Sequence, residues 1–348
     1  MKDRRNWNNI EYEADWMRRK RKRIKMPVLA LVFMDILIIG VSLSLFALFN
    51  HVIPNVESGD LSLHSGGGTP TPSKVVKTQA PENTANPGDS EELDWGVKFA
   101  DKFTDGEIIK LTDSYKSKDV SVTVTKVQKD GITYFVQDIY VRNIENIRTA
   151  FANDSYGGGL KQNTTKIANN NNAICAINGD YYGARDSGVV IRNGYTYRVK
   201  PYADVCILFY DGKMVTYPKE NFYVDQIESE GGSIYQAWCF GPSLLDRNGK
   251  ALSDFRSGVD NDNPRTAIGY YEPGHYCFVV VDGRQKGYSD GISMDGLAKL
   301  FEELGCKVAY NLDGGQTSMM TFNGALVNQP FNDGRSCSDI VFICEWEG

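Results

Sequence analysis

The amino-acid sequence predicts an α+β protein, with a mixed β-sheet core and a few helices forming a single domain behind one N-terminal transmembrane helix. Three observations predict this. Short apolar runs bounded by turn residues outnumber the amphipathic stretches. These runs do not alternate with helices, which disfavours a doubly wound α/β fold. One uninterrupted apolar segment, residues 27–49, lies near the N-terminus, and a polar stretch separates it from the strand-rich part.

The segment 27–49 predicts a membrane anchor. It has 23 residues with one charge, Asp35, and about 20 apolar residues span a bilayer. Because the run is longer than the core of a secretory signal and no A-x-A-like site follows it, we expect an uncleaved anchor, with a cleaved signal peptide as the alternative. Residues 1–26 carry ten Lys/Arg and four Asp/Glu. This excess predicts a single-pass cell-membrane protein with a basic cytoplasmic tail and an extracytoplasmic main domain.

Residues 50–92 are predicted to form a flexible linker. They are rich in Ser, Thr, Gly and Pro and have few large apolar residues, so they cannot bury a core. The folded domain is expected over residues 93–348. The 322 residues after the basic tail carry a net charge of −12. Such an acidic balance argues against nucleic acid as a partner.

All seven cysteines lie in the folded domain. An odd number leaves at least one cysteine unpaired within the chain. No C-x-x-C pair is present, so a zinc site is not expected. Most of the cysteines lie inside apolar runs, and we interpret them as small buried residues whose disulfide pairing stays open.

The folded domain is predicted, in chain order, to contain a hairpin, further strands and two helices. Asp130-Gly131 between "VSVTVTKVQ" and "ITYFVQDIYV" predicts the hairpin. Residues 159–171 favour one helix. Ser293 is a suitable N-cap for a second, in which apolar residues recur at helical spacing up to Gly305. The further strands are expected at residues 173–178, 189–192, 205–210, 234–240, 266–271, 276–281, 306–311 and 339–345.

Three of these strands end in a carboxylate next to a glycine. In "AICAINGDYYG" the apolar strand runs into Asp180, in "CFVVVDGRQKG" into Asp282, and in "CKVAYNLDGGQTS" into Asp313. Each alone is typical of a capped turn. If the strands adjoin in one sheet with the same direction, the three acids line one edge, where ligands often bind. Three such ends in one chain therefore indicate a site.

Two arginines strengthen this interpretation. Arg265 and Arg284 lie beside these segments, and a guanidinium matches phosphate bidentately. Carboxylates and arginines together suit hydrolysis at an anomeric carbon, with one acid as base or nucleophile and another protonating the leaving group. A phosphate leaving group would need little protonation. A Ser-His-Asp triad is not expected, because the domain contains a single histidine, His275.

Five segments resemble, in order and spacing, the phosphodiester glycosidase family: "AINGDYYG", "GVVIRNG", "NPRTAIGY", "VVVDGRQKGYSDGISM" and "AYNLDGGQTSMM". The resemblance implies a hydrolase that cleaves a sugar-1-phosphate diester of an N-acetylglucosamine-like sugar. One departure is Gln316-Thr317, where the family pattern has Gly and Ser; the longer side chain at 316 is expected to narrow the pocket or change the substrate. Arg335, in the loosely matching "NDGRSCSDIVF", is a weaker candidate.

Carried over by position, the resemblance supplies the site residues. We expect Asp180 and Asp313 to do the acid/base or nucleophilic work, with Asp282 as an alternative. Arg265 and Arg284 are expected to clamp the phosphate. The other predicted substrate contacts are Asn178, Gly314, Gly315, Thr317 and Ser318.

The anchor and the family together indicate a cell-surface enzyme that acts on exopolysaccharide or a wall glycopolymer. Two alternatives stay open. One is a non-catalytic glycan-binding module in envelope or spore assembly. The other is a metal-dependent phosphodiesterase in which Asp180, Asp282 and Asp313 hold Ca²⁺ or Mg²⁺; no other cofactor is expected. The sugar, the stereochemical outcome and the oligomeric state stay open.

Overall fold

The computed structural model describes residues 73–74, 94–255 and 261–346. They belong to one compact unit, Ser65–Gly348. The basic tail and the predicted anchor 27–49 lie outside the described residues, as does the predicted linker except for residues 73–74. No helix of the described part is long and apolar enough to cross a membrane.

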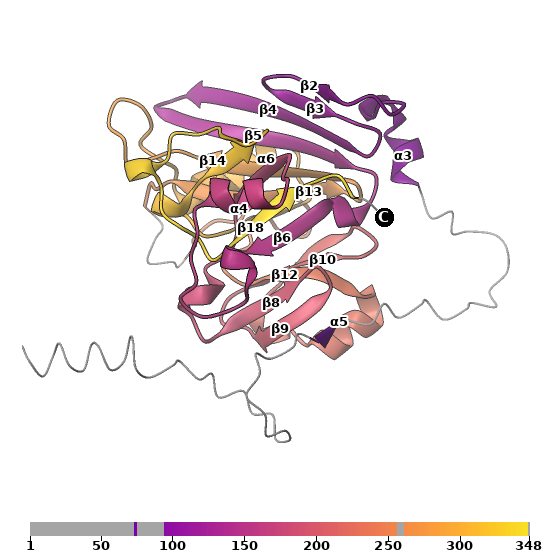
Figure 1. Cartoon of the computed structure of the whole chain (residues 1–348). Helices are drawn as coiled ribbons and strands as arrows, with labels where there is room; N and C mark the ends of the chain where they lie inside the picture. The colour runs from indigo at the N-terminus through magenta and orange to yellow at the C-terminus, as the bar shows by residue number, and fades with distance from the viewer. Residues whose placement is uncertain (1–72, 75–93, 256–260, 347–348) are drawn as a thin grey trace, which may run out of the picture. The chain divides into compact units, whose positions relative to one another are not determined.

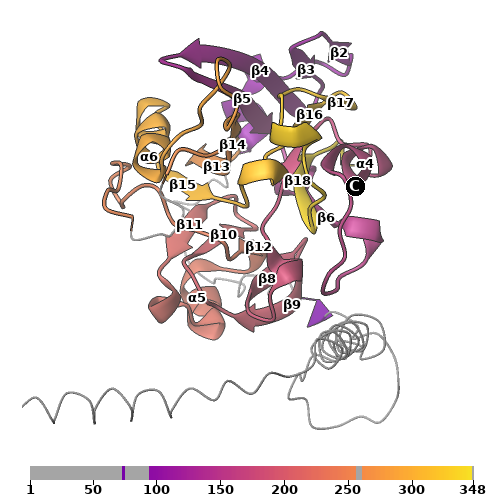
Figure 2. The same ribbon diagram turned by 90° about the vertical axis from the view of Figure 1, so that its left-hand side faces the viewer.

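Three β-sheets form the described part of this unit (Figures 1 and 2). Sheet A has the strand order β1-β9-β8-β12-β10-β11, sheet B the order β15-β13-β14-β5-β4-β3-β2, and sheet C the order β17-β16-β7-β18-β6. The strands are β1 Ser73–Lys74, β2 Ile109–Lys110, β3 Ser114–Lys116, β4 Val120–Lys129, β5 Ile132–Val141, β6 Ile147–Phe151, β7 Cys175–Asn178, β8 Gly188–Arg192, β9 Tyr195–Lys200, β10 Val205–Phe209, β11 Met214–Tyr217, β12 Ile234–Trp238, β13 Arg265–Glu272, β14 His275–Val281, β15 Val308–Asn311, β16 Met320–Phe322, β17 Ala325–Leu326 and β18 Asp339–Ile343. The α-helices of the described part are α3 Trp95–Lys98, α4 Thr164–Asn170, α5 Val224–Gly231 and α6 Met294–Glu303.

The predicted α+β class is confirmed, but the predicted mixed sheet is not what the structure contains. Every strand pairing in the described residues is antiparallel. The reason lies in the connections, because many neighbouring strands are joined by tight turns. Parallel neighbours need a crossover of about a dozen or more residues, usually a helix, and the described part of the chain has few helices.

Local signals predicted several elements well. Asp130 (φ 52°) and Gly131 (φ 75°) form the tight turn between β4 and β5, since a two-residue hairpin turn of this kind needs positive φ at both positions. The Ser293 hydroxyl accepts the N–H of Gly296 and caps α6 as expected. Asn163 caps α4 in the same way. Helix α5 and strand β6 were not predicted, because neither shows a strong apolar period.

The largest buried cluster lies where the three sheets meet. It includes Ile139 and Phe278 from sheet B, Ile177 from sheet C, and Leu208 and Trp238 from sheet A. Burial of such side chains is worth roughly 1.5–3 kcal/mol each. The sheets therefore share one apolar core, and this core holds their strand ends in place.

Helices cover other faces of the sheets (Figure 2). Leu297 of α6 lies in one buried cluster with Val279 of sheet B. Ile227 of α5 clusters with residues of sheet A, and Ile167 of α4 with residues of sheet C. All seven cysteines are buried free thiols, which agrees with their interpretation as small apolar residues.

Candidate active site

The ends of β7 and β15 meet at the junction of sheets C and B. The Asp313 N–H donates to the Gly179 carbonyl at 3.3 Å. Asn178, which is fully buried, donates from Nδ2 to the Asp313 carbonyl at 2.7 Å and accepts the Thr266 hydroxyl at 2.8 Å. Its Oδ1 also accepts the Met319 N–H at 3.2 Å. Asn178 therefore positions the loop that carries Asp313. Both polar atoms of its side chain are hydrogen-bonded within the protein.

Asp180 is buried and held by three donors. Oδ1 accepts the Tyr182 N–H at 3.2 Å and Oδ2 the Cys239 N–H at 3.1 Å. The third is Arg192, whose Nη2 lies 3.0 Å from Oδ2; this contact is an ion pair without a well-aligned hydrogen bond, since Nη2 has no hydrogen-bond partner within the described residues. These contacts fix the position of the Asp180 carboxylate.

Arg192 also binds a second buried acid, Asp339. Its Nε donates to Asp339 Oδ2 at 2.9 Å, and both side chains are at most 1% exposed. Burial raises the pKa of Asp339 to about 7 although Arg192 opposes the shift, and the charges of Asp180 and Asp313 raise it further. One arginine therefore faces two acids in a dry environment.

Asp313 lies at the start of the loop that follows β15. The Thr317 hydroxyl donates to its Oδ2 at 2.8 Å, and the Gly314 N–H to its Oδ1 at 3.0 Å. Burial raises the pKa of the Asp313 carboxyl, and Asp180 adds to the rise, whereas Thr317, Arg335 and Gly314 oppose it. A carboxyl with a raised pKa is typical of acid/base sites.

Arg335 reaches the same group from the C-terminal segment. Its Nη2 lies 3.4 Å from Asp313 Oδ2 and 2.7 Å from the Thr317 hydroxyl. The guanidinium also lies over the Tyr181 ring, with 5.5 Å to the centroid. Because the side chain is 42% exposed, it has donors left for an anionic ligand.

Asp282 has hydrogen-bond partners of its own. Strands β14 and β15 flank β13 and are both antiparallel to it, so Asp282 and Asp313 follow strands of the same direction. Asp282, however, accepts from Tyr288 at 2.9 Å, Asn328 at 2.7 Å and the Gln329 N–H at 2.9 Å. Burial raises its pKa too, but its partners tie two loops together.

Two of the three predicted acids thus converge, and Asp339 stands where a third was expected. In the described part of the chain, no group of three or more His, Cys, Asp or Glu side chains is placed to hold a metal ion. A shared Ca²⁺ or Mg²⁺ stays a prediction.

The two predicted phosphate arginines differ in their surroundings. Arg265 is buried and donates to the carbonyls of Ile292 at 3.1 Å and Asn261 at 2.8 Å. Arg284 is exposed and donates twice to the Asn263 side-chain oxygen, at 3.0 and 2.8 Å. Its guanidinium lies beside Gly315, where an added Cβ would be 3.3 Å from Nη2. Arg284 is therefore accessible next to the Gly-Gly turn, and Arg265 is occupied by the backbone.

The remaining predicted contacts lie in this turn. Gly315 has φ +69°, and a Cβ at Gly314 would lie 2.9 Å from the Pro264 carbonyl, so the turn requires both glycines. Gln316 donates to the carbonyls of Asn332 at 3.3 Å and Gly334 at 3.2 Å. Its side chain therefore holds the loop that precedes Arg335. Thr317 and Ser318 are buried.

A cavity of about 420 Å³, which we call the aromatic cavity, has Phe240 in its wall, next in sequence to Cys239, whose N–H donates to Asp180. Tyr202, Phe240 and Arg185 line it, and the Arg185 guanidinium lies 4.1 Å from the Tyr202 ring centroid. Burial raises the pKa of Tyr202, Arg185 opposes this, and the charges of Asp180 and Asp313 add to it. Tyr202 therefore lines the cavity and lies within electrostatic range of the two acids.

The model of the phosphodiester glycosidase family matches residues 171–344. The chain belongs to the phosphodiester glycosidase family. All the acids described above fall inside the matched range. Residues 94–141, which contain strands β2, β3, β4 and β5 of sheet B, lie before the matched range.

Two further proteins are similar to this chain. The chain is 27% identical over 309 residues to the uncharacterized SPbeta prophage-derived protein YomE of Bacillus subtilis (strain 168), covering 79% of this chain and 45% of that protein. It therefore spans about half the length of this curated relative. The zebrafish N-acetylglucosamine-1-phosphodiester alpha-N-acetylglucosaminidase catalytic domain, solved in a form auto-inhibited by its pro-peptide, has the same fold. Its TM-score is 0.52 at 19% identity, with 66% of this chain and 83% of that one covered.

Sequence reasoning missed two residues of this site, Arg192 and Asp339. Arg192 ends the apolar run "GVVIR", and Asp339 begins the apolar run "DIVFI". A charge at the border of a buried strand is ordinarily taken as exposed. The sequence did contain a signal: Arg192 lies in "GVVIRNG" and Asp339 in "NDGRSCSDIVF", both of which resemble the family.

Proposed function

We propose that the chain is a hydrolase that cleaves the bond between a sugar anomeric carbon and a phosphodiester oxygen. The observation that carries this proposal is the pair Asp180 and Asp313. Each is buried, and each has donors on both carboxylate oxygens. The family to which the chain belongs supports the same reaction class.

Asp313 is proposed as the general base. Its raised pKa makes the carboxylate a better proton acceptor than an exposed aspartate. It takes a proton from the attacking water, and the C–O bond to the phosphate breaks as the new bond to the anomeric carbon forms. The phosphate leaves with the electron pair and needs little protonation.

Asp180 is proposed to act as a charged group that does not transfer a proton. Arg192 and two backbone N–H groups hold its charge, and a fixed negative charge stabilises the oxocarbenium-like transition state of glycoside hydrolysis. Asp180 thus acts through its charge, and Asn178 acts through the position it gives to the Asp313 loop.

Arg335 and Arg284 are proposed to bind the phosphate. Both are exposed. Arg335 binds Thr317, and the Arg284 guanidinium lies beside Gly315, so both lie near the Gly314-Gly315 turn. This proposal replaces Arg265 with Arg335 as one of the two clamps, because the donors of Arg265 meet backbone carbonyls. A guanidinium pair suits a diester phosphate that gains charge as it leaves.

The sugar is proposed to lie in the aromatic cavity. Its volume falls in the range of small-ligand sites, roughly 300–1,000 Å³. Tyr202 and Phe240 offer aromatic surface to a pyranose, and an N-acetylglucosamine-like sugar is proposed from the substrate named for the zebrafish relative. With the predicted anchor 27–49, the substrate is proposed to be a cell-surface exopolysaccharide or wall glycopolymer.

The test is hydrolysis of a synthetic N-acetylglucosamine-1-phosphate methyl diester by the purified full-length chain. Sugar release is expected, and Asp313→Asn should lower kcat about 100-fold or more. As a control, Asp105→Asn replaces an exposed acid and should leave kcat unchanged. Glycan binding without turnover on any phosphodiester would instead favour the non-catalytic module. Activity that disappears with a chelator and returns with Ca²⁺ or Mg²⁺ would favour the metal-dependent phosphodiesterase.

A further inference from the structure

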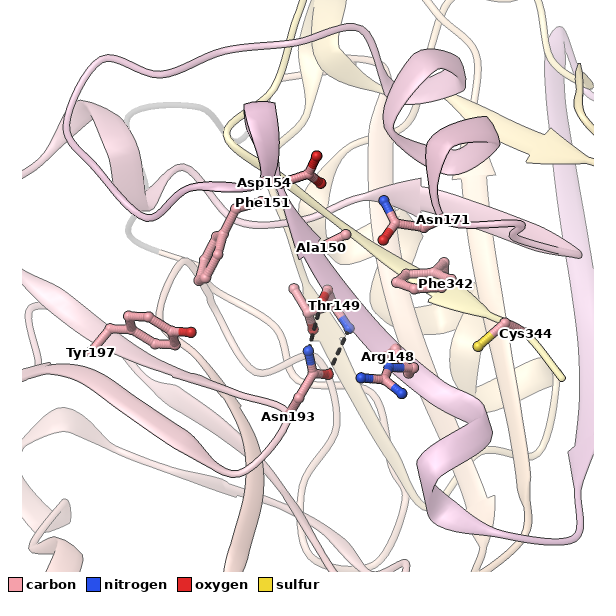
Figure 3. A pocket seen from close by; sticks show the side chains of 10 residues that line it. All are labelled: Arg148, Thr149, Ala150, Phe151, Asp154, Asn171, Asn193, Tyr197, Phe342 and Cys344. Carbon is pink, nitrogen blue, oxygen red and sulfur yellow. Dashed lines mark hydrogen bonds between the residues drawn. The ribbon is translucent and has the colours of Figure 1, made fainter. Parts of the chain in front are cut away.

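A second cavity lies between the edge of sheet C and the β8–β9 hairpin of sheet A (Figure 3). We call it the edge cavity. Its volume is about 330 Å³, at the lower end of the range for ligand sites. Strand β6 contributes Arg148, Thr149 and Phe151, and the hairpin contributes Asn193 and Tyr197. None of these residues takes part in the proposed hydrolysis.

Hydrogen bonds between the two sheets form the floor of the edge cavity. Strand β6 is the edge of sheet C. The Asn193 side chain binds the outward-facing backbone groups of Thr149, donating to its carbonyl at 2.8 Å and accepting its N–H at 3.0 Å. Gln236 donates to the same Asn193 oxygen at 2.8 Å. Because Thr149 is already paired, an extended peptide cannot add to the sheet at this point. The occupant must be recognised by side chains.

Two polar groups at this floor are unused. Arg148 is half-buried and has no ion pair or hydrogen bond to any described residue. The Tyr197 hydroxyl likewise has no hydrogen bond within the described part of the chain, and Figure 3 shows it on the opposite side of the Thr149–Asn193 pair from the Arg148 guanidinium. A partly desolvated guanidinium is most favourable when it faces an oxyanion, which it binds through two parallel N–H groups.

The walls of the edge cavity are aromatic. The Phe151 and Tyr197 rings pack edge to face, with centroids 4.9 Å apart and an interplanar angle of 83°. Tyr156 packs against Tyr197 at 4.9 Å. These contacts fix the rings before any ligand binds, which lowers the entropic cost of binding. Asn171 and Asp154 at the rim add an amide and a carboxylate that suit hydroxyl groups.

We propose that the edge cavity binds a small anionic sugar, a pyranose that carries a carboxylate or a phosphate. The oxyanion pairs with Arg148, the ring lies against Phe151 and Tyr197, and the rim side chains bind its hydroxyl groups. The cavity volume limits the occupant to about one sugar unit. This site is separate from the hydrolytic one and does not depend on whether the acids catalyse.

Calorimetric titration of the full-length chain tests the proposal, with glucuronate, glucose 6-phosphate, glucose and inorganic phosphate as probes. At least one anionic sugar should bind about tenfold more tightly than both glucose and inorganic phosphate, and the tighter of the two identifies the acid group. Arg148→Gln should weaken that binding about tenfold or more, and Tyr197→Phe, which keeps the ring packing, about threefold. Arg142→Gln, an exposed arginine of the same segment, should bind like the parent.

Three results would overturn the proposal. Equal binding of inorganic phosphate and the anionic sugars would make this an ion site without sugar recognition. Binding that survives Arg148→Gln unchanged would place the sugar elsewhere, for example in the aromatic cavity. No binding by the folded parent chain would leave the edge cavity without this ligand. Hydrolysis of the methyl diester by Arg148→Gln should equal that of the parent, which separates this site from the proposed catalytic one.

Discussion

The Nη2 atom of Arg192 lies 3.0 Å from Oδ2 of Asp180, and both side chains are 1% exposed. A charge pair this far from water stays favourable only while both partners are present, since removal of one leaves the other charge buried. Asp339 shares the same arginine. Arg192 is therefore the shared cationic partner of two buried acids.

Replacement of Arg192 should destabilise the protein strongly. Arg192→Met leaves two buried acids without a cation, and loss of one partner of a buried pair costs about 3–5 kcal/mol. Urea denaturation of parent and variant at pH 7 measures this difference. Arg142→Met, whose ion pair with Asp94 is exposed and 3.8 Å long, should cost less than about 1 kcal/mol. An equal loss of unfolding free energy in the two variants would show that the buried ion pairs of Arg192 do not stabilise the protein more than an exposed pair.

The stability of the protein should fall as the pH rises towards 8. Burial raises the pKa of Asp339 to about 7 from its usual value of 3.8, so the folded state binds this proton more tightly than the unfolded state. The stabilisation is fully present below about pH 4 and is lost as the pH rises through about 7. Melting curves between pH 5 and 8 measure the slope.

Asp339→Asn provides the matched test of that slope. The amide mimics the protonated acid, so the variant should lose much of the decline in Tm between pH 5 and 8. Asp105→Asn removes an exposed acid and should keep the parent slope. If Asp339→Asn follows the parent at every pH, another group titrates in this window.

Thr317→Val should shift the pH dependence of hydrolysis. The Thr317 hydroxyl donates to Asp313 Oδ2 at 2.8 Å and lowers the pKa of that carboxyl against the effect of burial. Without this donor the pKa of Asp313 rises further. For a general base, activity is lost as the pH falls through its pKa, so the acidic limb of the kcat/KM profile should move to higher pH. A limb that stays in place would assign it to another group.

Gln316→Ala should raise KM about three- to tenfold with little change in Tm, because it releases the loop that positions Arg335. The side chain binds two backbone carbonyls, so the stability loss should be near 1 kcal/mol or less. Gln226→Ala removes one exposed hydrogen bond in α5 and should leave KM unchanged. An unchanged KM in Gln316→Ala would separate this glutamine from phosphate binding.

Local patterns predicted those elements whose signals lie within a few residues. The cap at Ser293, the turn at Asp130-Gly131 and the buried runs before Asp180 and Asp313 depend on neighbours in the sequence. Strand pairing depends on distant segments, and the expected mixed sheet was wrong for that reason. The same limit explains Asp282, which follows a strand of the right direction yet turns to Tyr288 and Asn328.

By itself, the sequence determined the α+β class, the family and the acids at the strand ends, because these depend on residue type, order and short-range periodicity. Only the tertiary structure decided which acids share an environment. Asp180, Asp313 and Asp339 come from strands of two sheets, and their burial around Arg192 and Arg335 follows from how those sheets pack. Packing over such separations sets the desolvation and the charge partners of each acid, and these in turn set its pKa.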